Sequence, residues 1–182
     1  MAICVNTCAQ NQITHLINAC NDFKIGDAPA VGLIFCEDVY NDLLPDFESD
    51  VLWAAATADP NDAVIIKNVT VSRTSEISEK ENPVANGEEN YSDGTTYTMT
   101  ITDPNVSCDN HDFYTRLNGR KAYIVVAYND GRMEVSEDYF TIYSKLPSIE
   151  KNATQLYEIM AKRKFTREKS WLCFEAQPAI FS

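Results

Sequence analysis

The residues of this chain best suited to chemistry are three cysteines and a histidine near its start. Cys4, Cys8, His15 and Cys20 offer three thiolates and one imidazole, a ligand set that suits zinc. Their spacing matches no common zinc finger, because finger cysteines usually come in tight Cys-x2-Cys pairs. The alternative is three thiols and a polar histidine on an arm. We predict no metal and no cofactor, and keep this set as the one zinc candidate.

Nucleophilic and acid–base catalysis find little support. The chain has 2 histidines, His15 and His111, and neither stands in a recognisable motif. No Gly-rich phosphate loop, Gly-x-Ser-x-Gly or His-Glu-x-x-His pattern occurs. The many carboxylates are expected on the solvated surface, their usual place. The sequence therefore predicts no catalytic residues and a protein that is not an enzyme.

The six cysteines show no disulfide-framework rhythm. The first residues carry no basic stretch of a secretory signal, and no apolar run approaches the roughly 18 to 20 residues that span a bilayer. We therefore expect folding in a cytoplasm, no membrane contact and free thiols. Cys36 and Cys173 stand in apolar strand-like runs, which predicts that both are buried.

The charge is strongly negative and unevenly distributed. The chain holds 15 basic and 27 acidic residues, a net charge of −12. Six of the basic residues but only three of the acidic ones follow position 150. A body this acidic repels phosphate backbones, which argues against a specific nucleic-acid binder. The basic stretch is either a solvated face, an anion contact or, as we favour, a surface that pairs head-to-tail with an acidic copy; its members are Lys162, Arg163, Lys164, Arg167 and Lys169.

The hydrophobic pattern predicts a mainly β fold. Thr95–Thr102 alternates threonines with Tyr97, Met99 and Ile101, which indicates a half-buried antiparallel strand. One short helix is expected over Asn110–Leu117, with Asp109 as its N-cap. Further strands are expected at 31–36, 51–57, 63–73, 122–128, 132–137, 139–143, 156–165 and 171–174. The segment Thr154–Phe165 also has some helical propensity, but we favour a strand at 156–165 that pairs with 171–174. About eight strands and one flanking helix give an antiparallel β-sandwich or barrel.

The expected organisation is an N-terminal arm, residues 1–25, and a single β-sandwich domain, residues 26–182. Inside the domain, residues 74–94 read as a long polar, acidic loop. Such loops are uncommon in compact domains and are usually functional or disordered. We expect this one to become ordered against another surface; its interface candidates are Glu76, Glu79, Glu81, Glu88 and Glu89.

The order of features resembles a known family. The features are an N-terminal segment ending near Cys20, the turn in Phe35–Val39, the polar loop, the strand Thr95–Thr102, the helix Asn110–Leu117, the segment Tyr128–Gly131 and the closing Trp171–Phe181. Together they resemble phage tail tube proteins, in the form found among phages of Bacteroides-type hosts, crAss-like phages included. The basic segment Thr154–Phe165 and the six cysteines depart from that pattern.

The resemblance implies a non-enzymatic virion subunit in a phage tail, assembled in the bacterial host cytoplasm. It would form a homo-oligomeric ring, six- or twelve-fold, through sheet extension, and contact neighbouring tail or neck proteins. The ring would be a conduit for genome ejection, through which DNA passes without specific binding, and an acidic lumen would favour that passage. The alternatives are a capsid-decorating or head-fibre protein, and a ligand-binding β-sandwich module with Trp53, Tyr91 or Tyr97 as its platform.

Overall fold

The computed structural model describes residues 30–81, 90–129, 131–147, 156–165 and 171–182. The predicted N-terminal arm, with the zinc candidate Cys4, Cys8, His15 and Cys20, lies outside these residues. So do Glu88, Glu89, Arg167 and Lys169. No helix in the described part of the chain is long and apolar enough to cross a membrane.

The described residues form nine strands and three α-helices, and the predicted mainly antiparallel β fold is confirmed. One flanking helix was expected, so the helices are more numerous than predicted. The elements are β1 (Ala30–Ile34), α1 (Glu37–Leu43), α2 (Asp50–Ala56), β2 (Ala63–Ile66), β3 (Thr70–Glu81), β4 (Asn90–Asp103), α3 (Cys108–Leu117), β5 (Lys121–Ala127), β6 (Met133–Val135), β7 (Phe140–Lys145), β8 (Tyr157–Phe165), β9 (Leu172–Phe174) and the 3-10 turn η1 (Ala179–Phe181).

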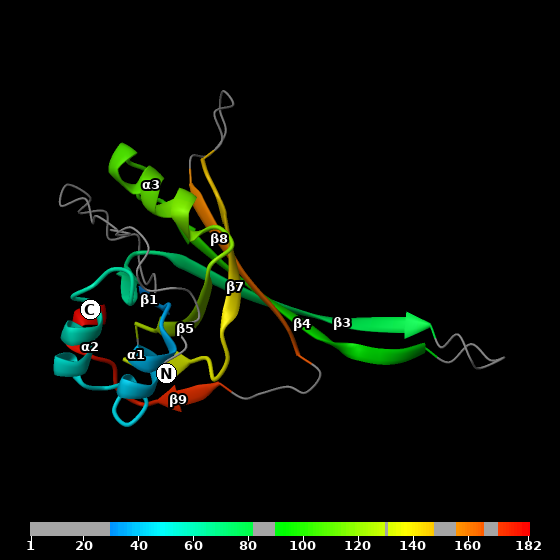
Figure 1. Cartoon of the computed structure of the whole chain (residues 1–182), viewed down its shortest axis with the longest axis horizontal. Coiled ribbons are helices and arrows are strands. Elements are labelled where there is room, and N and C mark those ends of the chain that lie inside the picture. The colour runs from blue at the N-terminus through cyan, green and yellow to red at the C-terminus, as the bar shows by residue number, and fades with distance from the viewer. Residues whose placement is uncertain (1–29, 82–89, 130, 148–155, 166–170) are drawn as a thin grey trace.

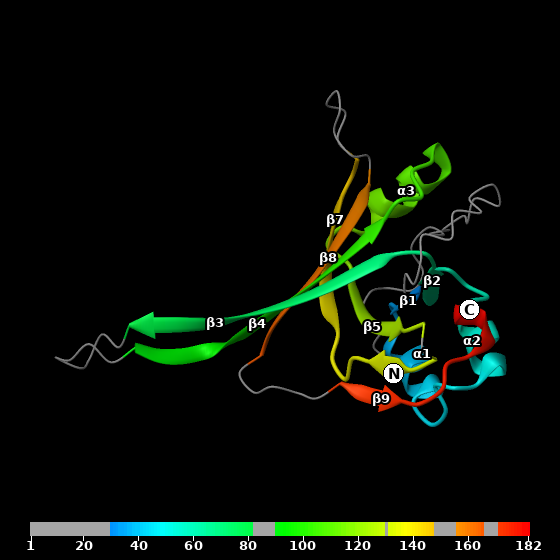
Figure 2. The same cartoon turned by 180° about the vertical axis from the view of Figure 1, so that it is seen from behind.

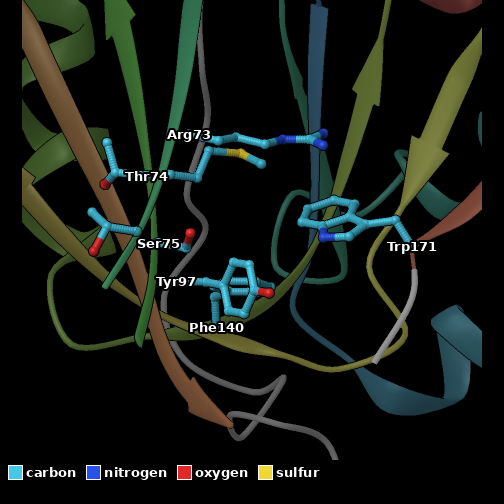
Figure 3. A pocket seen from close by; sticks show the side chains of 8 residues that line it. Arg73, Thr74, Ser75, Tyr97, Phe140 and Trp171 are labelled. Atoms are coloured by element: carbon cyan, nitrogen blue, oxygen red, sulfur yellow. The ribbon is translucent and has the colours of Figure 1, made fainter. Parts of the chain in front are cut away.

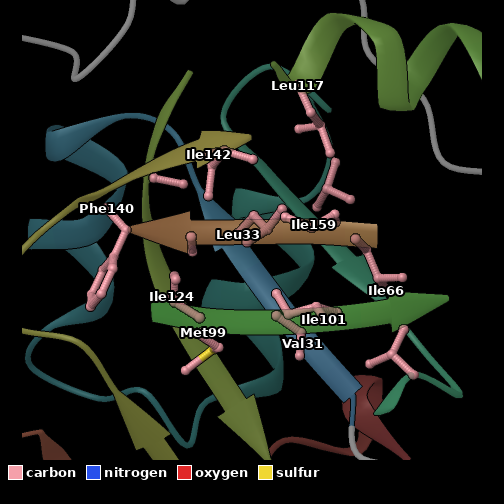
Figure 4. Packing of buried hydrophobic residues seen from close by; sticks show 14 of the residues in the cluster. Val31, Leu33, Ile66, Met99, Ile101, Leu117, Ile124, Phe140, Ile142 and Ile159 are labelled. Atoms are coloured by element: carbon pink, nitrogen blue, oxygen red, sulfur yellow. The ribbon is translucent and has the colours of Figure 1, made fainter. Parts of the chain in front are cut away.

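The strands form one continuous sheet in the order β2-β1-β5-β7-β8-β4-β3, with β6 and β9 continuing from β5 on a side branch. Side chains from seven of these strands and from α3 meet in one apolar cluster, which means that the sheet curls around its own core (Figure 4). A second cluster lies on the other face of β1 and β5, beneath α1, α2 and η1. The molecule therefore has two cores that share two strands.

The shared strands are buried on both faces. In β1, Val31 and Leu33 belong to the first core and Ile34 to the second. In β5, Ile124 and Val126 face the first core while Val125 faces the second. Such strands read as continuous apolar runs rather than as alternating ones, which is how both were recognised in the sequence.

The segment 51–57 was predicted to be a strand and is instead helix α2. The Ser49 hydroxyl caps it by accepting a hydrogen bond from the amide of Leu52 (3.5 Å). Trp53 and Ala56, three residues apart, form its buried face, and the Trp53 indole donates to the Phe47 carbonyl (2.8 Å). Cap, alanines and three-residue spacing together favour a helix. The short helix α1 was not predicted.

Helix α3 confirms the predicted helix, with Phe113, Tyr114 and Leu117 buried. Its N-cap is Ser107 rather than Asp109, since the Ser107 hydroxyl accepts from the amide of Asn110 (3.2 Å).

Two strand predictions need correction. The run 63–73 is divided into β2 and β3, which lie at opposite ends of the sheet order, and Asn68 takes a left-handed conformation (φ 59°) between them. β9 pairs with β6 and not with the segment 156–165. That segment is strand β8, as predicted, but it lies between β7 and β4.

The predicted loop 74–94 is largely a β-hairpin. Residues 74–81 belong to β3 and residues 90–94 to β4, in antiparallel register; residues 82–89 lie outside the described part. The hairpin projects from the body, while α1, α2 and the C-terminus gather at the other end of the molecule (Figures 1 and 2).

Candidate assembly surface

The feature that most needs a partner is the β3–β4 hairpin. Among the described residues, β4 pairs with β8 over Thr95–Asp103, and residues 90–92 pair with β3 alone. We call residues 79–81 and 90–92 the hairpin tip. An isolated two-stranded hairpin is marginally stable in water at best. A neighbouring surface would therefore stabilise the hairpin tip.

The hairpin bends where the tip begins. The register of β3 and β4 shifts between Ile77 and Glu79, and Gly94 has a φ of 110°, which glycine adopts readily. A β-bulge of this kind bends the strand and increases its twist. Because of this bend, the hairpin tip runs at an angle to the rest of the hairpin.

In the part of the chain that the structure describes, strand β3 is also a free sheet edge. It pairs with β4 along one side and ends the strand order of the sheet. Along its 12 residues, about 40 Å of strand, the backbone groups on its other side pair with no described strand. Exposed edges of this length are templates for pairing with another chain.

The outward side of β3, β4, β7 and β8, which we call the open face, is polar, and none of its side chains is buried. Its members, placed by the strand registers, are Thr70, Ser72, Thr74, Glu76, Thr96, Thr98, Thr100, Thr102, Thr141, Tyr143, Lys145, Glu158, Met160, Lys162 and Lys164. The alternation predicted for Thr95–Thr102 is confirmed, since Met99 and Ile101 are buried on the other side.

The structure divides the basic interface candidates. Lys162 and Lys164 are exposed on the open face. Arg163 points to the other side and is held within the copy: its guanidinium forms an ion pair with Asp138 (3.2 Å) and donates to the Tyr139 carbonyl (2.6 Å). Arg163 is therefore engaged inside the fold.

The acidic candidates are close to the basic ones in the same copy. Glu76 is exposed and pairs with Thr96, which pairs with Lys164, so acid and base are two strands apart in one row. Glu79 and Glu81 lie in β3 opposite Ser92 and Asn90. The predicted separation of acidic and basic poles does not hold for Glu76 and Lys164.

A pocket of about 210 Å³ lies at the base of the hairpin, on the inner side of the sheet (Figure 3). We call it the base pocket. Its walls include the rings of Tyr97, Phe140 and Trp171, with Arg73 above. The Arg73 guanidinium lies 4.3 Å from the centre of the Trp171 ring and forms an ion pair with Glu134 at 2.5 Å. Because this charge is already compensated, the pocket suits an apolar group.

The second core carries a cluster of tyrosines with perturbed acidity. Tyr40 stacks on Tyr123 with 4.0 Å between ring centres. The pKa of Tyr40 is raised to about 12, chiefly by burial and secondly by the neighbouring Tyr123. Both rings remain neutral at physiological pH and act as packing groups.

Trp53 and Tyr97 do not form the proposed aromatic platform together. Trp53 is fully buried between α2 and β1, and Tyr97 is half-buried at the base pocket. The structure does not describe the side chain of Tyr91.

Of the two histidines, His111 is exposed on α3. Among the described residues no group of three His, Cys, Asp or Glu side chains could hold a metal ion.

The cysteine predictions fail at two points. Cys36 is disulfide-bonded rather than a free thiol. Cys173 is free, as predicted, but it is exposed in β9 rather than buried.

Sequence reasoning missed the base pocket. Arg73, Tyr97 and Phe140 come from separate strands, and Trp171 from the residue before β9, so only the strand order brings them together.

Comparison with protein-family models, with curated proteins and with solved structures finds no match.

Proposed function

We propose that this chain is a non-enzymatic virion structural subunit that oligomerises into a ring or tube in a phage tail and forms a conduit for genome ejection. The observation that carries the proposal is the β3–β4 hairpin, which projects beyond both cores and ends in a two-stranded tip (Figures 1 and 2). The described residues give this tip no support beyond its own two strands, and burial against another copy would stabilise it.

The free edge of β3 supports the same proposal. Adding a strand to this edge would satisfy its backbone groups with directional hydrogen bonds, which is how sheets extend between chains. A heterologous contact of this kind closes into a ring when its rotation permits, and otherwise grows as a filament. Both geometries serve a tail.

The open face supplies a surface that such a ring could turn toward its lumen. Threonine and serine hydroxyls dominate it, and its charged groups, Glu76, Lys145, Glu158, Lys162 and Lys164, are of both signs. Mixed charge and short hydroxyls give passing DNA little to bind, since affinity for phosphate needs clustered cations. This wall would be hydroxyl-rich rather than acidic.

The test is negative-stain electron microscopy of the purified protein, with mass photometry on the same sample. We expect rings or stacked tubes with a central hole. Trimers, or a stable monomer that binds purified capsids, would instead support a decorating or head-fibre protein.

A further inference from the structure

We propose that the base pocket receives the side chain of Ile77 from a second copy of this chain. The inference deepens the proposed assembly and rests on it. It names the residue that enters, the pocket that accepts it and the contact that joins the two copies.

The pocket has the size and chemistry for one apolar side chain. Its volume is about 210 Å³, and cavities of about 150 Å³ with apolar walls accommodate a benzene molecule. Tyr97, Phe140 and Trp171 provide the walls (Figure 3). An aliphatic group with no charge fits such walls, because Arg73 is already paired with Glu134.

Ile77 is an aliphatic side chain without cover. It is 70% exposed, on the projecting part of β3. By the alternation of the strand it lies on the same face as Arg73 and Ser75, the face that carries the pocket. It does not line the pocket of its own copy, whose lining residues from β3 are Arg73, Thr74 and Ser75.

A second copy whose hairpin lies against the pocket-bearing face of the first brings its own Ile77 over the pocket. The two groups then cover each other, since each is an apolar surface that its own copy leaves open. Leu44 and Val51 are further exposed aliphatic residues, but they belong to the α1–α2 layer at the other end of the molecule (Figure 1).

Charge favours this docking over the other broad surface of the molecule. Ile77 is flanked in β3 by Glu76 and Glu79. Residues 37–62, which include α1 and α2, hold eight acidic and no basic residues, so they repel an acidic hairpin. The pocket is instead bordered by the Arg73–Glu134 ion pair, which carries no net charge and adds no such repulsion.

The first experiment measures self-association of two variants by mass photometry across a concentration series. Ile77→Asp removes the entering group, and Ser75→Phe fills the pocket from its exposed rim without altering the core. Burying an isoleucine is worth enough to change a dissociation constant by about tenfold to a hundredfold, so we expect each variant to weaken association by that factor. Val51→Asp and Ser72→Phe, exposed positions away from the pocket, are matched controls and should associate as the parent does.

Mixing the two variants tests the geometry. Ile77→Asp keeps an intact pocket and Ser75→Phe keeps Ile77, so an equal mixture should form pairs more tightly than either variant does alone. A photoreactive benzophenone residue at position 77 should crosslink to Tyr97, Phe140 or Trp171 of an isotopically distinguished chain.

Two outcomes separate this inference from the proposed function. Rings formed equally well by Ile77→Asp, or crosslinks that fall elsewhere, would overturn the inference and leave the tail-subunit proposal standing. Pairs that depend on Ile77 but never close into rings or tubes would support the inference and count against the tail subunit.

Discussion

Gly32 is the residue at which the second core comes closest to the backbone of the sheet. A Cβ atom there would meet the Trp53 ring at 3.2 Å and the Phe181 ring and Val125 Cβ at 3.3 Å. Trp53 and Phe181 pack edge to face at 4.8 Å between ring centres. The absence of a side chain at Gly32 is therefore what allows α2 and η1 to lie on β1.

Gly32→Val should destabilise the fold by about 1–3 kcal/mol, the usual cost of forcing extra methyl groups into a packed core. Urea titration followed by tryptophan fluorescence measures the change. A second change, Phe181→Leu, should recover part of the loss by giving the new side chain room. Equal midpoints for Gly32→Val and the parent would contradict this packing.

Tyr40 makes the fold sensitive to alkaline pH. Its pKa is raised from the ordinary 10.0 to about 12, chiefly by burial. A group with a raised folded pKa contributes stability that is complete below the unfolded pKa and is lost as the pH rises through the folded one. The free energy of unfolding should therefore fall between pH 10 and about pH 12.

The measurement is urea unfolding at several pH values in this window, alongside the tyrosinate absorption of the native protein. Tyr40→Phe should flatten part of the decline, since phenylalanine has no proton to lose. If the free energy of unfolding of Tyr40→Phe falls with pH as steeply as that of the parent, groups other than Tyr40 cause the decline.

Cys36 and Cys173 should differ in their reactivity toward an alkylating agent. Cys173 is exposed and free, whereas Cys36 is bonded. Alkylation of the native protein without reductant should label Cys173 and spare Cys36, and reduction after unfolding should make Cys36 reactive. Peptide mass spectrometry reads both sites, and labelling of native Cys36 would refute the disulfide.

At the scale of elements, the hairpin should be separable from the body. The described side chains that form both cores lie outside residues 76–96. Replacing residues 76–96 by Asn-Gly joins Ser75 to Tyr97, which face each other in the register, through a favoured two-residue turn. Thermal unfolding of this variant should stay cooperative, and rings should disappear from electron micrographs. Rings formed without the hairpin would argue against its role in assembly.

The same separation explains which elements the sequence could predict. β4 shows alternation because one side of Thr95–Asp103 is buried, and burial is what gives a strand its period of two. Residues 74–81 and 90–94 carry no such pattern, because their hairpin stands outside the cores, so they read as a loop. α2 was mistaken for a strand because its apolar run of Val51 to Ala56 hides the three-residue spacing of Trp53 and Ala56.

The candidate surface was predicted only in part. Glu76, Lys162 and Lys164 are exposed as expected, since charged side chains seldom tolerate burial. Their positions relative to one another follow from strand order, and local pattern does not encode that order. The base pocket was missed for the same reason.

For the molecule as a whole, the net charge should determine how the affinity between copies depends on salt concentration. Each copy has a net charge of −12. Repulsion between copies is screened over about 10 Å at 0.1 M salt and about 3 Å at 1 M. If apolar contacts such as that of Ile77 hold the copies together, association should tighten as salt rises.

Mass photometry at low and high ionic strength measures how association between copies depends on salt. Lys162→Glu makes the copy more acidic and should steepen the salt dependence. Association that weakens with salt would favour the head-to-tail pairing of opposite charges over apolar docking.

The independence of the hairpin from both cores also bears on how such a chain can change over generations. A substitution in the tip alters what the molecule recognises while leaving the folding of its body untouched. Partner choice and stability are thus encoded in different stretches of the sequence and can be selected separately. A chimera carrying a foreign hairpin between Ser75 and Tyr97 should fold as this chain does and take its partners from the donor.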